Sequence, residues 1–118
     1  MTKNPIVYLK HILDCIIKIK EYTQGVDQDD FLKNSLLQDG VIRNLEIIGE
    51  ATKRLDQQFR IKHPKIEWKK IAGMRDKLVH DYIGVDLLAV WGVVEKIIPD
   101  LDKQIEDIIK EEDGTGKL

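Results

Sequence analysis

An arginine, a histidine and a tyrosine lie within residues 75–82 in an R-x4-H-x-Y pattern, with an aspartate directly after the arginine. The guanidinium of Arg75 can hold a phosphate through two parallel charge-assisted hydrogen bonds. The imidazole of His80 can accept or donate a proton near neutral pH. These two groups are the minimum needed to cleave a phosphodiester without a metal. We therefore take Arg75 and His80 as candidate catalytic residues.

The spacing of these residues limits how one helix could present them. Arg75 and His80 are five residues apart and would point about 140° apart on a helix. Two copies of the chain that meet across a two-fold axis could instead converge on one cleft, each giving an arginine and a histidine. Asp76 and His80 would share a helix face, so the carboxylate could orient the imidazole, although an ordinary surface pair has the same spacing. Tyr82 could pack in the core, stack on a base or be exposed for modification.

The totals are typical of one globular domain. The chain has 118 residues, 42% of them apolar and 34% charged, and a net charge of −2. We expect a single domain over residues 1–110 and a disordered tail over residues 111–118. The chain has no run of 18 apolar residues, so the sequence predicts no membrane span. A lone cysteine excludes an internal disulfide and suits the cytoplasm.

The charge is unevenly distributed along the chain. Residues 51–80 carry nine basic and three acidic residues, whereas residues 81–118 carry four basic and ten acidic ones. The basic third leads into the motif, so a local anion-binding surface is plausible despite the acidic total. The alternative is that its basic residues form a solvated helix face.

Apolar residues at helical spacing predict an all-α protein, a compact up-down bundle of four to five helices. The first helix has Asn4 as its N-cap, Pro5 at its first position and Gly25 just past its end. A second helix begins at Ser35, with Gln38 completing a capping box. It continues to about residue 60.

The second half of the chain predicts shorter elements. A short helix over residues 66–74 is followed by the motif helix, from about residue 74 to 81. Asp86 then caps a final helix, which Pro99 either kinks or divides. The sequence shows neither strand alternation nor a hairpin signal.

Three charged residues of the second helix are candidates for lining the cleft, namely Arg43, Glu46 and Glu50. Salt bridges at the surface are an equal alternative for them. His11 and Cys15 have a metal-binding spacing, but two ligands do not make a zinc site, and we expect Cys15 in the core. We expect His63 to cap helix carbonyls. No glycine-rich phosphate loop is present, so we expect that the chain does not bind ATP by itself and that nucleotidyl transfer belongs to the partner. We expect neither a cofactor nor a metal.

The motif and its surroundings resemble the HEPN superfamily, and in particular its HepT-like ribonuclease toxins. The resemblance covers roughly residues 5 to 108. The matching residues are Arg75, Asp76, His80 and Tyr82 in the motif, with Ile47-Ile-Gly-Glu-Ala51, Trp68, Val85-Asp86 and Val90-Trp91 around it.

This resemblance implies a helical bundle that forms a homodimer, with two motifs facing each other, and metal-independent cleavage of RNA. His80 would move the protons and Arg75 would hold the scissile phosphate. Tyr82 matches the tyrosine to which a minimal nucleotidyltransferase (MNT) antitoxin transfers AMP, as in a type VII toxin–antitoxin pair. Neither DNA nor a membrane is an expected partner.

Two other functions compete with this one. The chain could be a non-catalytic helical subunit that binds a minimal nucleotidyltransferase and presents substrate to it, with Arg75 and His80 contacting nucleotide phosphates only. It could also be a plain dimeric scaffold in which the motif is structural. Loss of RNA cleavage in a folded His80→Ala protein would distinguish the ribonuclease from the non-catalytic subunit and from the scaffold.

Overall fold

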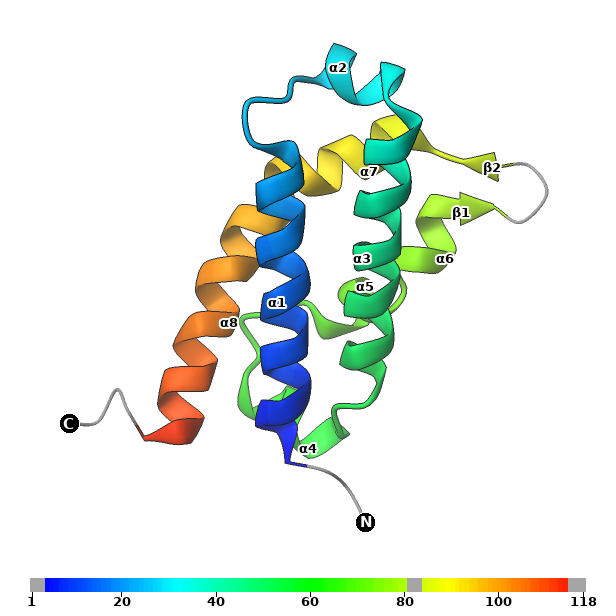
Figure 1. Cartoon of the computed structure of the whole chain (residues 1–118). Helices are drawn as coiled ribbons and strands as arrows, with labels where there is room; N and C mark the ends of the chain where they lie inside the picture. The colour runs from blue at the N-terminus through cyan, green and yellow to red at the C-terminus, as the bar shows by residue number, and fades with distance from the viewer. Residues whose placement is uncertain (1–3, 81–83, 115–118) are drawn as a thin grey trace.

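The structure is a computed structural model that describes residues 4–80 and 84–114 (Figure 1). The prediction of an all-α protein is confirmed. Within these ranges the helices and strands are α1 (Pro5–Thr23), α2 (Gln28–Lys33), α3 (Ser35–Lys53), α4 (Gln57–Lys62), α5 (Trp68–Ala72), α6 (Met74–Leu78), β1 (Val79–His80), β2 (Gly84–Val85), α7 (Leu87–Gly92), a π-helical turn (Val93–Ile97) and α8 (Ile98–Asp113).

Three long helices form the body of the molecule. α1 packs against both α3 and α8, and the shorter helices cover the ends and the far side of α3 (Figure 1). Their facing sides carry the fully buried aliphatic residues, each of which contributes roughly 2 kcal/mol by leaving water. These are Leu9, Ile12, Ile16 and Ile19 on α1, Val41, Leu45 and Ile48 on α3, and Ile98, Leu101 and Ile105 on α8. None of the helices in the described ranges combines the length and the apolar character that crossing a membrane needs.

The start and end of α1 follow the prediction. The side chain of Asn4 accepts a hydrogen bond of 2.9 Å from the backbone N–H of Ile6, and Pro5 occupies the first helical position. Gly25 has a φ of +72°, a conformation that glycine adopts without strain.

The second long helix differs from the prediction at both ends. α3 does begin at Ser35, but its N-cap is Asn34, and the amide of Gln38 donates to the Phe31 carbonyl at 2.9 Å instead of completing a capping box. The helix ends at Lys53 and not near residue 60. The cause is Asp56, whose carboxylate caps the separate helix α4.

The predicted motif helix is also shorter in the structure. α6 ends at Leu78, and the chain then turns back as a two-residue antiparallel pair in which Val79 faces Val85 and His80 faces Gly84. The expectation of no strand was therefore wrong for this segment. Gly84 has a φ of +107°, which favours glycine.

The C-terminal part of the chain settles the two alternatives for Pro99. A π-helical turn precedes it, and Pro99 then lies in the first turn of the new helix α8, where its missing N–H is tolerated. Asp86 caps α7 as predicted, accepting from the Ala89 N–H at 3.0 Å. α8 continues through Asp113, so residues 111–113, placed by prediction in a disordered tail, are helical.

Candidate functional site

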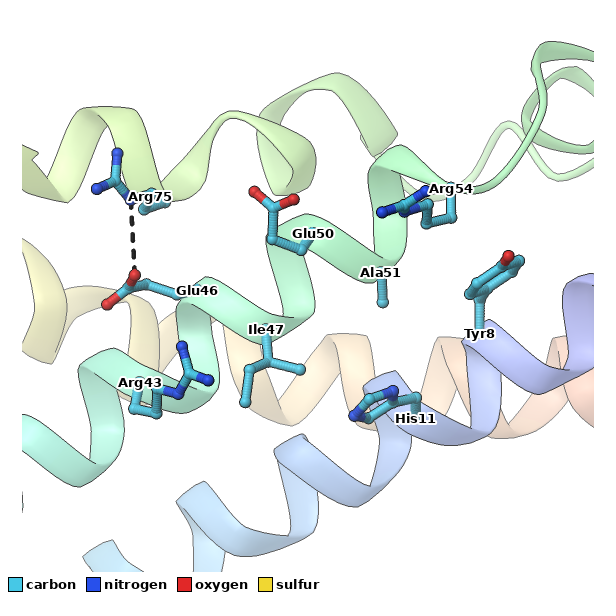
Figure 2. Close-up of a pocket in the computed structure, with 9 residues that line it drawn as sticks. All are labelled: Tyr8, His11, Arg43, Glu46, Ile47, Glu50, Ala51, Arg54 and Arg75. Atoms are coloured by element: carbon cyan, nitrogen blue, oxygen red, sulfur yellow. Dashed lines mark ion pairs between the residues drawn. The ribbon is translucent and has the colours of Figure 1, made fainter.

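A cleft of about 350 Å³ lies between α1 and α3, with Arg75 of α6 at one end (Figure 2). It brings the motif arginine together with the three charged residues of α3 that the sequence offered as cleft lining. Its walls are formed by Tyr8, His11, Arg43, Glu46, Ile47, Glu50, Ala51, Arg54 and Arg75.

The cleft exists because α3 has two different faces. Val41, Leu45 and Ile48 are buried against α1 and the core. The cleft residues of α3 recur every three or four positions from 43 to 51, and the C-cap residue Arg54 continues the series, so they form a second stripe beside the buried one. α1 supplies the facing wall with Tyr8 and His11, which are one helical turn apart.

A glycine brings the motif helix close to α3. A Cβ added at Gly49 would lie 3.4 Å from the carbonyl oxygen of Ala72 in α5. The absence of a side chain therefore lets α3 and α5 approach closely, as the sequence suggested for an interior glycine. α6 follows directly and is anchored by buried Met74 and Leu78, which leaves Arg75 on the cleft side.

Arg75 is held only loosely. Its Nε lies 3.6 Å from a carboxylate oxygen of Glu46, and its Nη1 lies 3.5 Å from one of Asp76. Good charge-assisted hydrogen bonds are about 2.7–2.9 Å long. The Arg75 side chain is 43% exposed. It therefore keeps donors available for an anion that enters the cleft.

The remaining motif residues are only partly covered by the structure. Tyr82 lies outside the described residues, and for His80 only the backbone, in β1, is described. α6 ends before His80, so Asp76 and His80 do not lie on one face of a continuous helix as their spacing suggested. Asp76 lies beside Arg75 instead, and its role in orienting His80 stays a prediction.

Three cleft residues were not singled out from the sequence. Arg54 belongs to the basic segment over residues 51–80, for which an anion-binding surface and a solvated helix face were both open. His11 was considered only with Cys15 as a metal pair, and Tyr8 was not considered. The signal for Arg54 was present, since it continues the stripe that begins at Arg43. Tyr8 and His11 could be found only once α1 was known to face α3.

His63 and Cys15 have structural surroundings. The ring of His63 is buried, and its Nε2 lies 2.8 Å from Glu112 of α8. The prediction that this side chain caps helix carbonyls was therefore wrong. Cys15 lies in the core, where burial raises the pKa of its thiol. The described residues contain no group of three or more histidines, cysteines or carboxylates that could hold a metal ion.

The fold and the cleft define a small helical domain with an arginine-bearing site, and comparison with known proteins gives its family. Residues 12–108 match the family model described as Ribonuclease HepT-like. The chain belongs to the HepT-like ribonuclease family.

Relatives in several organisms cover most of the chain. A protein of Caldanaerobacter subterraneus subsp. tengcongensis named "Putative RNase" is 46% identical over 93% of this chain and 98% of its own length. A "Probable ribonuclease HepT" of Thermococcus cleftensis is 44% identical over 87% of this chain and 94% of its own. A longer protein of Methanocaldococcus jannaschii, "Gamma-glutamylcyclotransferase and putative RNase", is 50% identical over 96% of this chain, which spans 51% of that protein. No solved structure was found to match the chain.

Proposed function

We propose that this chain is a metal-independent endoribonuclease and the toxin of a type VII-like toxin–antitoxin pair, with Arg75 and His80 as its catalytic residues. The observation that carries the proposal is the position of Arg75. In a chain of the HepT-like ribonuclease family, this guanidinium stands at the end of an open cleft, and its ion pairs to described side chains, Glu46 and Asp76, are long.

The chemistry needs two proton transfers at one phosphate. One imidazole takes the proton of the ribose 2′-hydroxyl, and the 2′-oxygen attacks phosphorus. The bond from phosphorus to the 5′-oxygen breaks, and a second imidazole gives that oxygen a proton. The products are a 2′,3′-cyclic phosphate and a 5′-hydroxyl. Arg75 neutralises the charge that develops on the non-bridging oxygens.

A homodimer supplies the second imidazole. Each chain carries one R-x4-H pattern. In a two-fold dimer whose motifs face each other, one His80 acts as base and the other as acid. Glu46 holds the Arg75 guanidinium near the cleft until a phosphate takes its place.

Neutralisation follows from the position of Tyr82 in the sequence. In the sequence this residue stands two positions after His80 and seven after Arg75. AMP transferred to its hydroxyl by a nucleotidyltransferase antitoxin adds a bulky anionic group to the motif. That group repels the RNA backbone and competes for the Arg75 guanidinium.

The test uses purified protein whose Tyr82 is shown to be unmodified by intact mass. The wild-type chain, His80→Ala and Arg75→Ala are incubated with total cellular RNA in EDTA, after circular dichroism and sedimentation have shown equal folding and assembly. We expect cleavage by the wild type alone, with products that end in a cyclic phosphate. Cleavage retained by pure His80→Ala protein would contradict the assignment. No cleavage by the unmodified wild type would favour the non-catalytic subunit that binds a nucleotidyltransferase.

A further inference from the structure

The α1–α3 cleft extends well beyond Arg75. Arg43 lies on α3, and Arg54, the C-cap residue of that helix, continues the same stripe; both are exposed. They are eleven residues apart, which is three turns of helix and roughly 16 Å along its axis. Figure 2 shows Arg75 and Arg43 at one end of the cleft and Arg54 at the other. The cleft is therefore long enough to hold more than the reacting phosphate.

The far end of the cleft pairs a cation with an aromatic ring. Tyr8 of α1 is half-buried in the wall and lies at the same end as Arg54 (Figure 2). Within the described part of the chain, Arg54 makes no side-chain hydrogen bond or ion pair. Glu50 lies between the two ends, and Lys53 stands 3.5 Å from its carboxylate, which weakens its repulsion of an anion.

A guanidinium and a ring at this separation from the motif match the chemistry of an unpaired nucleotide. Guanidinium groups bind phosphates, and tyrosine rings stack on bases of any sequence. A base inside a duplex is already stacked on its neighbours on both faces, so the matching ligand is single-stranded.

We propose that Tyr8 and Arg54 form a binding subsite for a nucleotide of single-stranded RNA that flanks the scissile phosphate. Arg54 holds the phosphate of that nucleotide, and Tyr8 stacks on its base. Arg43 stands beside Arg75 and carries the strand from the reacting phosphate into the cleft. The inference rests on the proposed ribonuclease function and assigns to it a substrate that is longer than the cleaved dinucleotide.

Salt dependence of binding separates a phosphate contact from a stacking contact. Binding of a labelled single-stranded RNA is measured in the His80→Ala background, so that the RNA stays intact. For single strands each phosphate contact contributes about 0.7 to the slope of log affinity against log salt. We expect Arg54→Ala to lower this slope by about 0.7. Lys103→Ala, which removes an exposed lysine of α8 away from the cleft, should leave it unchanged.

The aromatic residue gives the complementary result. Tyr8→Leu should weaken binding about fivefold to a hundredfold without changing the slope, because stacking releases no counterions. Tyr8→Phe keeps the ring and should bind like the parent, which guards against a loss due to misfolding. Tyr22→Leu is the matched control, since this exposed tyrosine lies on the same helix but outside the cleft.

Cleavage by the active protein tests the length of the subsite. Arg54→Ala and Tyr8→Leu should raise KM for a longer oligonucleotide and leave kcat/KM for a dinucleotide unchanged, because a dinucleotide does not reach the subsite. An unchanged salt slope in Arg54→Ala, or an equal loss on the dinucleotide, overturns the subsite. A sedimentation change that accompanies weaker binding in Arg54→Ala also overturns it, since Arg54 would then act at a contact between copies.

The subsite and the proposed function fail in different ways. RNA binding that depends on Arg54 and Tyr8, in a protein whose unmodified form does not cleave RNA, supports the subsite and overturns the nuclease. Cleavage of long RNA that is indifferent to both residues supports the nuclease and overturns the subsite.

Discussion

Two clusters in this molecule each combine basic side chains with a glutamate, and they differ in burial and in the length of their contacts. In the α1–α3 cleft, Arg75 is 43% exposed and lies 3.6 Å from Glu46. On the side where α8 ends, the His63 side chain is 6% exposed and its Nε2 lies 2.8 Å from Glu112. Lys62 reaches the same carboxylate at 2.9 Å.

The surroundings of the buried histidine explain its pairing. The ring of Phe59 lies 4.8 Å from that of His63, and the indole N–H of Trp68 donates to the His63 carbonyl at 2.8 Å. These contacts join α4 and α5 to the last turn of α8. A polar group that is buried with a short hydrogen bond stabilises a fold, whereas an exposed cation with long contacts is available for a ligand. A histidine beside a carboxylate is therefore weak evidence of catalysis until its burial is known.

The largest expected effect is the loss of activity when the exposed cation of the cleft is removed. Arg75→Ala should lower kcat/KM for RNA about a hundredfold or more, because it removes the group that neutralises the transition state. The free energy of unfolding should change by less than about 1 kcal/mol, since surface ion pairs contribute little. Cleavage assays and urea unfolding measure the two quantities. Lys77→Ala, an exposed residue of the same helix, is the control and should change neither.

The opposite outcome is expected in the buried cluster. His63→Ala should lower the free energy of unfolding by about 2–4 kcal/mol, because it leaves a cavity against Phe59 and removes a partner of Glu112. Activity per folded molecule should not change. Urea unfolding of His63→Ala and of His11→Ala, whose histidine is exposed, gives the comparison. Equal stabilities of these two variants would show that burial does not distinguish the clusters.

A smaller effect is expected from the charge of Glu112 on stability, and it should depend on pH. Lys62 first, and His63 with it, hold the pKa of Glu112 below its usual range. A carboxylate whose pKa is lowered by folding stabilises the fold at any pH above its unfolded pKa, near 4, and loses this contribution as the pH falls through the folded value. Glu112→Gln should therefore be less stable than the wild type at neutral pH, and the difference should shrink below about pH 4. A difference that is constant across this window would mean that the Glu112 charge is not responsible.

The sequence predicted the family through its resemblance to known members, and it predicted the all-α fold and the caps of α1 because those depend on local spacing. It missed the end of α3 for a physical reason. Leu55 and Phe59 continue the apolar repeat across the break, so periodicity alone could not show it, although Asp56 is a good N-cap. Leu55 is buried just before α4 begins, and Phe59 is buried within α4.

The cleft was only partly predictable. Arg43, Glu46 and Glu50 could be proposed from one helix, because their spacing places them on one face. Tyr8 could not, because its position matters only through the packing of α1 on α3, which is a tertiary contact. The end of α6 at Leu78 was likewise hidden, since nothing in residues 75–82 breaks a helix before the glycine at position 84.

The smallest expected effect is on RNA binding, and it comes from the carboxylate that pairs with Arg75. Glu46 lies 3.6 Å from Arg75 and competes with RNA phosphates for the same guanidinium. Glu46→Gln keeps the size of the side chain and removes its charge, so RNA should bind about twofold to fivefold more tightly in the His80→Ala background, as expected for a charge at a partly exposed site. The salt slope should not change, because the number of phosphate contacts stays the same. Weaker binding would instead show that Glu46 positions Arg75 for RNA, and would give this loose ion pair the supporting role that Glu112 has for His63.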